Sequence, residues 1–441
     1  MSTADSPAGS VPLPTPQQVR WQDFEVGLVV HFDMPVFAPE GWAHAASRRL
    51  YAPDAYAPSS LDTDQWVEAA KAAGARFILF TATHFNGFLQ WQSDLYPYGV
   101  RQSAWRHGRG DVVGDFVESC RRAGMPAGLY MSCNGNAWWK VWRHRVNWGD
   151  GGEAQGAFVR TCERMVAELC TRYGELAEIW FDAGLLPPDA DGPDVLPIVE
   201  RHQPRGVFYH SPQRRDHRWI GNEDGVAPYP CWARMPDIDA AEAAHHGRCD
   251  GWRDLLASGD PDGTLWSPAM CDAPIRDHEW FWRPDEDHKI QPLDRLVGMY
   301  YKSVGRNGTL ILGATPNRDG LIPEADFRRY AEFGAEIRRR FASPIAETSG
   351  TGEAVELALP APSRIGHVVL MEDIEHGERV CRYRVEGRVG GDSWRTLCDG
   401  TAIGHKCIQE IGPVEVAAVR FVCTEAVAPP LLRQLAVYAP A

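Results

Sequence analysis

The chain has 441 residues, of which 44% are hydrophobic and 24% are charged, so it can bury a sizeable core and exceeds one ordinary domain. Its formal net charge of −14 repels phosphate backbones and anionic lipid, which argues against nucleic acid and membranes as partners. No run of about 18 apolar residues could span a bilayer. Residues 1–16 lack a signal pattern, so we expect a flexible N-terminal segment and a cytoplasmic location.

Three successive segments of the chain combine a helical pattern with a buried-strand pattern. Each helical pattern stops at a glycine, which can supply the left-handed residue that follows a helix. A nearly continuous apolar run comes next, as expected for a strand buried on both faces. The predicted helices cover 61–73, 111–123 and 154–173, and the predicted strands cover 76–83, 127–132 and 177–182.

This alternation of helix and buried strand predicts a parallel α/β sheet. Further strands are predicted over 26–32, 206–210, 218–221 and 309–314. Since no glycine-rich phosphate loop follows the first strand, we favour a closed (β/α)8-like (TIM-type) barrel over an open dinucleotide-binding sheet. The stretch 232–292 is predicted as loops over the active-site end of the barrel, and a helix over 323–340 would end the barrel.

The last part of the chain has a different pattern. From 354 to 438, short segments alternate polar and apolar residues, with turn residues about every ten positions, which is typical of a small β-sandwich. We therefore expect a flexible segment at 1–16, a catalytic barrel at 17–345 and a C-terminal β-sandwich domain at 346–441.

Polar side chains stand at the ends of the predicted barrel strands, where the active sites of such barrels lie. These residues are His31, His84, Tyr130, Asp182 and His210, followed by the turn 221–224 that contains Glu223. Convergence of so many polar residues at one end of a barrel predicts a binding or catalytic site there.

Asp182 and Glu223 give this site a specific chemistry. Glycoside hydrolysis needs two carboxyl groups, one ionised to attack the anomeric carbon and one protonated to assist the leaving oxygen. Asp224, next to Glu223, could share the second role. The 17 tryptophans offer aromatic faces against which sugars pack. The other acids of the loop region, Asp272, Asp277 and Glu279, are expected to be solvated or to cap backbone groups.

No cofactor or metal is expected. The cluster His245, His246, Cys249 and Asp250 has metal-ligand residue types but no recognised spacing. The eleven cysteines contain no C-x-x-C pair and are predicted to be reduced and mostly buried. A G-x-S-x-G elbow and a Walker loop are both missing from the sequence, which excludes the motifs of serine esterases and of P-loop nucleotide-binding proteins.

From about Trp21 to the C-terminus the chain resembles glycoside hydrolase family 29, the retaining α-L-fucosidases, and most closely the branch that acts on α-1,3/1,4-linked fucose. Residues 61–74 resemble the first barrel helix of that family, 81–88 its Lys-His-His-Asp-Gly-Phe motif, and 179–182 its nucleophile strand. Gly221-Asn-Glu223 matches the segment of the acid/base residue. Residues 301–307 with 316–320 resemble the final barrel strand, and the segments around 394–397 and 404–406 resemble the C-terminal sandwich.

The resemblance implies that Asp182 is the nucleophile and that Glu223 acts first as acid and then as base. Among the expected substrate-binding residues, His31, His84 and Tyr130 match sugar-binding positions, Trp42 resembles the tryptophan of a Glu-Trp pair, and Trp219 falls near the bound sugar. Three departures from the family pattern concern the pocket. Phe85 and Asn86 replace a histidine and an aspartate, Met270 replaces a glutamate, and Gly41 separates Glu40 from Trp42.

Three functions follow from this pattern. The first is a retaining exo-α-L-fucosidase that releases fucose from an oligosaccharide or glycoconjugate. The second is the same machinery acting on another fucose-like glycoside, such as an α-L-galactoside or a decorated natural product, which Phe85 and Asn86 favour. The third is a non-catalytic carbohydrate-binding protein on a decayed hydrolase scaffold.

Overall fold

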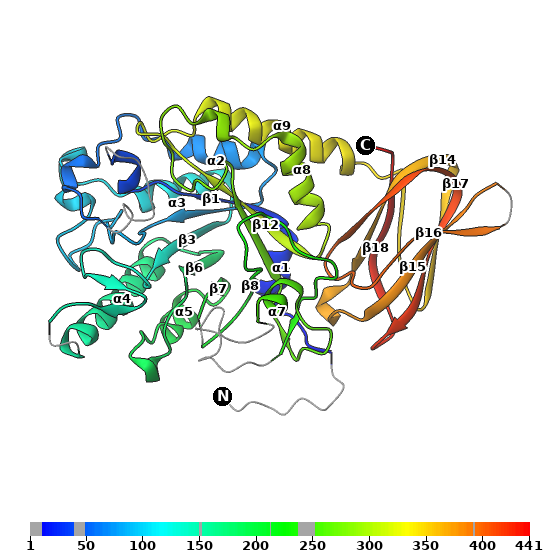
Figure 1. The fold of residues 1–441 in the computed structure, drawn as a ribbon, viewed down its shortest axis with the longest axis horizontal. Helices are drawn as coiled ribbons and strands as arrows, with labels where there is room; N and C mark the ends of the chain where they lie inside the picture. Colours follow the sequence, from blue (N-terminus) through cyan, green and yellow to red (C-terminus); the bar gives the residue numbers. More distant parts are fainter. Residues whose placement is uncertain (1–10, 39–48, 150–151, 212, 237–251, 391–392) are drawn as a thin grey trace.

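The computed structural model describes residues 11–38, 49–149, 152–211, 213–236, 252–390 and 393–441. The described chain forms two parts that lie side by side (Figure 1). One is an α/β barrel, coloured blue to yellow, and the other is a β-domain, coloured orange to red. The predicted fold class, a TIM-type barrel followed by a C-terminal β-sandwich, is confirmed.

Eight parallel strands form the barrel wall, in the order β7-β6-β3-β2-β1-β12-β11-β8. The first barrel strand in the chain, β1, pairs with the last one, β12, in the register Val26↔Leu310. Most of these strands are rich in apolar residues and all are almost wholly buried, as expected for parallel strands covered on both faces. The strands are β1 Val26–Val30, β2 Phe77–Thr81, β3 Ala127–Ser132, β6 Glu178–Asp182, β7 Val207–Tyr209, β8 Arg218–Trp219, β11 Ala269–Pro274 and β12 Gly308–Ala314.

Helices surround the strands, and several begin and end at the residues expected from the sequence. Asp62 and Asp111 accept hydrogen bonds from backbone N–H groups in the first turns of α2 and α3. The glycines that follow the three predicted helices all have positive φ, with Gly124 at 64°. The helices are α1 Pro16–Phe24, α2 Thr63–Ala72, α3 Val112–Ala123, α4 Gly152–Arg172, α5 Leu196–His202, α7 Trp252–Ser258, α8 Leu293–Lys302 and α9 Glu324–Phe341.

The barrel has two apolar layers that share its strands. Residues at alternate positions of the strands point inward and form an interior cluster, which includes Val29, Leu79, Tyr130, Trp180 and Ile311. Their neighbours in sequence point outward and pack against the helices in a larger cluster. Because the interior is filled with large side chains, the space for a ligand lies at the ends of the strands.

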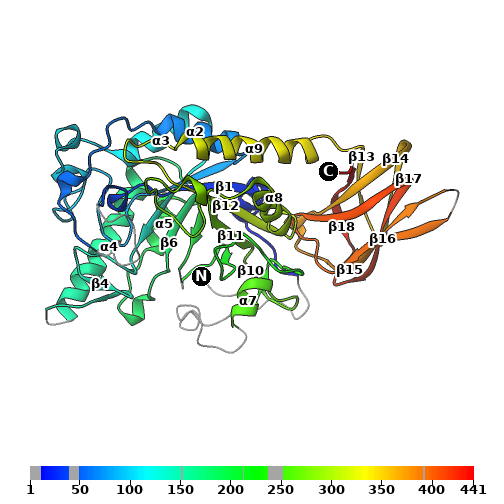
Figure 2. The same cartoon turned by 45° about the horizontal axis from the view of Figure 1, so that its top comes forward.

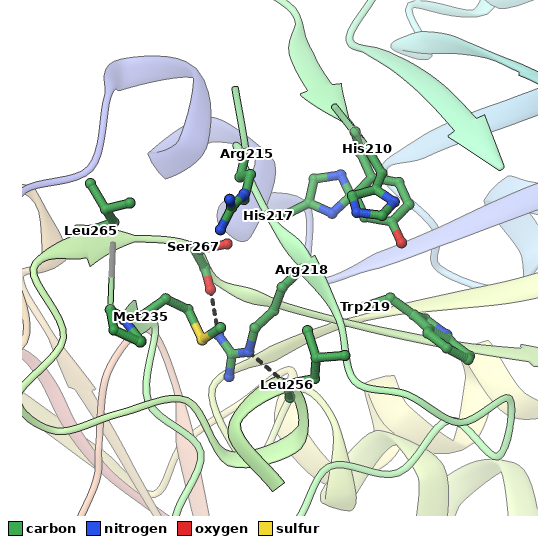
Figure 3. A pocket seen from close by; sticks show the side chains of 11 residues that line it. His210, Arg215, His217, Arg218, Trp219, Met235, Leu256, Leu265 and Ser267 are labelled. Carbon is green, nitrogen blue, oxygen red and sulfur yellow. Dashed lines mark hydrogen bonds between the residues drawn. The ribbon is translucent and has the colours of Figure 1, made fainter. Parts of the chain in front are cut away.

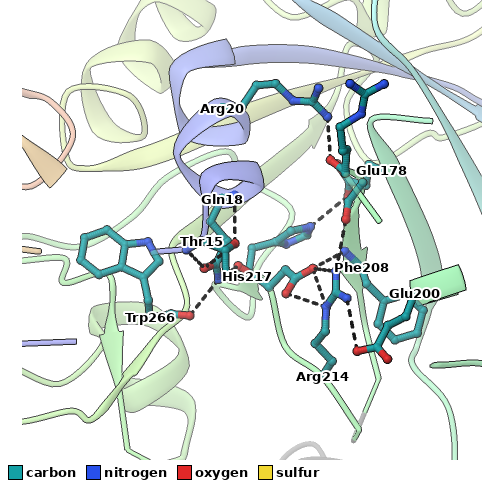
Figure 4. A network of polar contacts seen from close by, with 12 residues as sticks. Thr15, Gln18, Arg20, Glu178, Glu200, Phe208, Arg214, His217 and Trp266 are labelled. Carbon is teal, nitrogen blue, oxygen red and sulfur yellow. Dashed lines mark hydrogen bonds and ion pairs between the residues drawn. The ribbon is translucent and has the colours of Figure 1, made fainter. Parts of the chain in front are cut away.

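The barrel is closed by side chains between β7 and β8. Within the described residues no backbone ladder joins these strands, and one backbone bond, from Asp216 N–H to Phe208 O at 3.4 Å, spans the gap. The buried carboxylate of Glu178 on β6 contacts His217 Nε2 at 3.0 Å and accepts the Trp21 indole N–H of α1 at 2.8 Å. The His217 ring stacks between Trp21, at 4.3 Å, and Tyr209, at 4.5 Å. We call this junction between β7 and β8 the seam, and Figure 4 shows Glu178 and His217 within it.

The C-terminal domain is one six-stranded antiparallel sheet with the order β13-β18-β14-β17-β15-β16. Its strands are β13 Ala346–Thr351, β14 Ala354–Glu372, β15 Val380–Arg388, β16 Trp394–Gly400, β17 Cys407–Ala426 and β18 Leu431–Tyr438. The long strands β14 and β17 change register twice, between Ala358 and Ser363 and between Ile365 and His367. Figure 2 shows the domain beside α8 and the end of α9.

One face of this sheet supports the barrel. Along β18, Leu435 and Val437 belong to the core of the domain itself, whereas Ala436 and Tyr438 belong to the outer core of the barrel. Because successive side chains of a strand point to opposite faces, β18 packs against both the domain core and the barrel.

The segment 232–292, predicted as loops, contains regular structure. It includes the barrel strand β11, helix α7 and a small hairpin of β9 Arg234–Met235 with β10 Leu265–Trp266. The segments at 301–307 and 316–320 do not form the final strand but lie on either side of β12. A second hairpin, β4 Val141–Trp142 with β5 Arg145–Val146, follows β3.

Candidate active site

An open cavity lies at the carboxyl ends of the barrel strands. Its empty volume is about 700 Å³, part of which is open to solvent, a size typical of small-ligand sites. It brings together side chains from six barrel strands or the segments that follow them, as predicted from the polar strand ends. The lining residues are Val29, His31, His84, Phe85, Tyr130, Trp180, Asp182, Glu223, Asp272, His278 and Trp280.

Asp182 is the last residue of β6 and is half-buried at the base of this cavity. The hydroxyl group of Tyr130, on the neighbouring strand β3, donates to Asp182 Oδ2 at 2.6 Å. The pKa of Asp182 is raised to about 6, chiefly by burial and in part by nearby Glu223, although the Tyr130 hydrogen bond acts in the opposite direction. The carboxyl group is thus ionised above about pH 6 and oriented by a fixed donor, as a nucleophile must be.

Glu223 follows β8 and is exposed at the mouth of the cavity. The indole N–H of Trp280 donates to Glu223 Oε2 at 3.1 Å, so a residue distant in sequence fixes one carboxylate oxygen. The adjacent Asp224 is not among the lining residues and lies 3.7 Å from Arg295, at a side-chain exposure of 57%. Of these two acids, Glu223 is therefore the one placed for chemistry.

The two predicted histidines form an aromatic wall with Tyr130. The His84 ring stacks on Tyr130 at 5.7 Å, and the His31 ring meets Tyr130 edge-on at 5.6 Å. Trp280 lies 4.9 Å from His31. Burial lowers the pKa of His31 to about 3, so its imidazole is neutral and can both donate to and accept from a sugar hydroxyl group.

Asp272 was expected to be a solvated or capping loop acid, and this expectation was wrong. It lies on β11 with 5% of its surface exposed, and it lines the cavity beside Asp182 and Glu223. Trp219, predicted to lie near the substrate, donates its indole N–H to Asp272 Oδ1 at 2.7 Å. The sequence of β11, Ala-Met-Cys-Asp-Ala-Pro, does carry the pattern of a polar residue after an apolar run. This strand was not predicted because the residues around it are rich in Pro and Trp, which favours loops.

Of the other two loop acids, Asp277 is exposed, as expected, and lies 3.7 Å from Arg295. Glu279 is not solvated: its side chain is 14% exposed and pairs with Lys289 at 3.0 Å.

A model of the α-L-fucosidase family matches residues 16–339, about three quarters of the chain. The chain belongs to this family. A putative α-L-fucosidase 1 from Oryza sativa subsp. japonica is 32% identical over 98% of this chain and 86% of its own length. The α-L-fucosidase 1 of Arabidopsis thaliana is 29% identical over 98% of this chain and 88% of its own. A solved structure of a putative α-L-fucosidase from Bacteroides thetaiotaomicron superposes with a TM-score of 0.93 at 43% identity, covering 98% of this chain and all of the other.

Family membership makes the chain a glycoside hydrolase and a glycoside its substrate class. Two departures from the family pattern have a structural explanation. Asn86 is buried and donates from Nδ2 to Asp33 Oδ2 at 2.6 Å, where an aspartate would place two carboxylates in contact. Met270 is buried in the interior cluster of the barrel, where a glutamate would carry an unpaired charge.

The replacement of the family's histidine by Phe85 changes the cavity itself. Phe85 is half-buried in the cavity wall, 4.5 Å from the His84 ring and 6.4 Å from Trp142 of the β4–β5 hairpin. It presents an apolar surface where the family motif has an imidazole. A hydroxyl group of the ligand that faces Phe85 would therefore lose a hydrogen-bonding partner.

His210, the remaining strand-end histidine, lies in a different pocket at the seam (Figure 3). Arg218 in this pocket donates to the carbonyl groups of Leu256 and Ser267, which fixes it structurally. Trp219 stands between the two pockets, since it lines this one and bonds Asp272 of the other. The seam pocket is the smaller of the two, with an empty volume of about 510 Å³ against about 700 Å³ for the cavity at Asp182.

Some predicted residues lie outside the described part of the chain. They are Trp42, with Glu40 and Gly41, and the cluster His245, His246, Cys249 and Asp250. Among the described residues there is no group of three or more His, Cys, Asp or Glu that could hold a metal ion. In the same residues, no helix is both long and apolar enough to cross a bilayer. Ten cysteines are described, all as free thiols. Seven of them are buried, namely Cys120, Cys133, Cys162, Cys170, Cys231, Cys271 and Cys407, and the other three, Cys381, Cys398 and Cys423, are partly exposed.

Proposed function

We propose that the chain is a retaining exo-α-L-fucosidase that releases α-linked L-fucose from oligosaccharides or glycoconjugates. The observation that carries the proposal is the placement of Asp182 and Glu223 in one cavity, each held by a hydrogen-bond donor, Tyr130 and Trp280 respectively. Membership of the α-L-fucosidase family supports fucose as the glycone. The preference for 1,3- or 1,4-linked fucose is part of the proposal and comes from the resemblance to that branch.

In the first step Asp182 attacks the anomeric carbon and the glycosidic C–O bond breaks. Glu223, protonated, gives its proton to the departing oxygen, which leaves as an alcohol. The product is a covalent glycosyl ester of Asp182. The Tyr130 hydroxyl group remains bonded to the second oxygen of Asp182, which fixes the direction of attack.

In the second step Glu223, now a carboxylate, takes a proton from water, and the resulting hydroxide attacks the anomeric carbon. The ester bond breaks and Asp182 is released as a carboxylate. The exposed position of Glu223 supports this role, since both water and a leaving group must reach it. Two displacements at the same carbon leave its configuration unchanged.

The test is turnover of an aryl α-L-fucoside by the parent chain and by two acidic-site variants. Asp182→Gly should lower kcat by a factor on the order of 10⁴ or more, and added azide should restore part of the activity by acting as nucleophile in the space left. Glu223→Gln should leave kcat/KM on an activated aryl fucoside nearly unchanged and lower it strongly on fucosyl oligosaccharides, because only the latter need a proton on the leaving oxygen. On the aryl substrate kcat should still fall, because the second step loses its base. Asp224→Asn is the matched control, and equal losses for Glu223→Gln and Asp224→Asn would refute the assignment of Glu223.

A second candidate function is hydrolysis of another fucose-like glycoside, such as an α-L-galactoside. Phe85 favours it, because this ring changes the hydrogen-bonding wall of the cavity. A parent chain that hydrolyses an aryl α-L-galactoside faster than the fucoside would decide for this function. A folded parent that binds L-fucose without hydrolysing either substrate would instead be a carbohydrate-binding protein on a hydrolase scaffold.

A further inference from the structure

The buried carboxyl group of Asp272 has no part in the two-step reaction described above. It lies on a strand whose six residues are all buried, and its register places it level with Ile311 of the barrel interior. Despite this depth its side chain reaches the cavity that contains Asp182 and Glu223. A buried carboxyl group is destabilising unless its oxygens have partners, so its presence here needs an explanation.

The contacts of Asp272 account for one of its oxygens. Trp219 Nε1 donates to Oδ1 at 2.7 Å. Within the described part of the chain, Asp272 forms no ion pair with an arginine, lysine or histidine, so no cation holds it for structural reasons. Trp219 comes from β8, the strand beside β11 in the sheet, where Met270 pairs with Trp219, so both members of the pair are fixed by backbone ladders.

The charges around Asp272 favour its neutral form. Its pKa lies well above the usual range because the group is buried and because Glu223 and Asp182 face the same cavity, although the Trp219 hydrogen bond acts in the opposite direction. The cavity lining contains no lysine or arginine. A protonated carboxyl group is one hydrogen-bond donor with acceptor capacity to spare, which suits a sugar hydroxyl group.

We propose that Asp272 is a further glycone-binding residue, whose carboxyl group hydrogen-bonds one hydroxyl group of the sugar while Trp219 holds it in place. The inference rests on the proposed function, because it takes the sugar at Asp182 as the ligand. Asp272 on β11 and Phe85, which follows β2, line different parts of the cavity wall, with β1 and β12 between their strands. Selectivity for the sugar then depends on a polar wall at β11 as well as on an apolar wall at β2.

The experiment compares the parent, Asp272→Ala and Asp272→Asn on aryl α-L-fucoside and on its 2-deoxy, 3-deoxy and 4-deoxy analogues. Asp272→Ala should lower kcat/KM on the full substrate about 10- to 100-fold. On the one analogue that lacks the contacted hydroxyl group, the parent and Asp272→Ala should be equal. Asp272→Asn should keep most of the activity, because its amide can donate and accept as a neutral carboxyl group does.

Two further readouts separate binding from a structural role. Trp219→Phe keeps an aromatic ring but removes the donor, and should reproduce part of the loss with the same dependence on the analogue. Asp294→Ala, on the exposed start of α8, is the control carboxylate. In addition, the acid limb of the kcat/KM profile should stay in place in Asp272→Asn, since a neutral group leaves the charge near Asp182 unchanged.

The outcomes are distinguishable from failure of the proposed function. The inference is wrong if Asp272→Ala slows hydrolysis of the fucoside and of all three analogues by the same factor. It is also wrong if the thermal midpoint of Asp272→Ala falls in parallel with its activity while Asp272→Asn loses the same selectivity. In both cases the fucosidase proposal stands. If the parent hydrolyses none of these substrates, binding of L-fucose and its three deoxy forms is measured by calorimetry on the same variants. A parent that neither binds nor hydrolyses them would overturn both proposals.

Discussion

The two sides of the barrel hold the cavity by different means. On one side, β3 and β6 pair along five residues, from Gly128↔Glu178 to Ser132↔Asp182, so the backbone ladder itself fixes Tyr130 against Asp182. On the other side the sheet is interrupted between β7 and β8, and the buried Glu178–His217–Trp21 group joins the strands through side chains. Asp182, the proposed nucleophile, therefore rests on backbone hydrogen bonds, whereas the wall that carries Trp219 and Glu223 depends on a few buried polar contacts.

This difference separates two kinds of sensitivity. A ladder distributes its stability over many backbone hydrogen bonds, and a side-chain substitution leaves those bonds in place. A buried polar group concentrates stability in one place, since the loss of one partner leaves the others unsatisfied. We expect the seam to be the more fragile side.

The largest effect is expected at the seam itself. Glu178→Ala leaves the Trp21 N–H and His217 without their acceptor and opens a cavity, so it should lower the free energy of unfolding by about 3 kcal/mol. Glu175→Ala, which removes an exposed carboxylate near Arg20 and Arg205, should lower it by less than about 1 kcal/mol. Urea unfolding followed by tryptophan fluorescence measures both, and equal values would remove the distinction between the two sides.

A smaller effect is expected on the ladder side, at the loop after β2. Burial raises the pKa of Asp33 to about 7 although Asn86 donates to it. A raised pKa of an acid means that the folded state holds its proton more tightly, so the stabilisation is complete below about pH 4 and is lost as the pH rises through about 7. Asn86→Asp adds a second carboxyl group at this point and should lower the stability by about 2 kcal/mol at pH 8.

At pH 5 the loss in Asn86→Asp should be smaller, because one of the two carboxyl groups can keep its proton. The exposed Gln102 offers a control, and Gln102→Glu should change neither the stability nor its dependence on pH. Thermal melting at the two pH values tests this. A loss that is the same at pH 5 and pH 8 would show that charge repulsion is not the cause.

The smallest effect concerns the nucleophile. If Asp182 must be ionised to attack, kcat/KM should fall as the pH drops through about 6, the value to which burial raises its pKa. Tyr130→Phe removes the hydrogen bond that lowers this pKa, and should move the acid limb upward by about one pH unit. A limb that stays in place in Tyr130→Phe would mean that another group controls it.

Much of the barrel could be predicted from the sequence because its signals are local. Helical periodicity, a glycine after the helix and an apolar run each depend on neighbouring residues, and β2, β3 and β6 lie within a few residues of their predicted ranges. The strand β11 was missed because its six residues stand among Trp, Pro and Asp, and because the helix that should precede it is the short α7. Its partner strands, β12 and β8, are distant in sequence or very short.

The sequence by itself determined the order of most helices and strands outside 232–292, the carboxyl ends at which Asp182, Tyr130, His31 and His84 stand, and the change to a β-domain. These features follow from the alternation of side chains along a strand and from the rule that parallel strands share one end. Only the tertiary structure decided which residues distant in sequence contact the polar residues of the cavity and of the seam. Trp280 on Glu223, Trp219 on Asp272 and His217 on Glu178 join segments 39 to 57 residues apart, and such contacts depend on how loops and strands pack in space, for which neighbouring residues carry no signal.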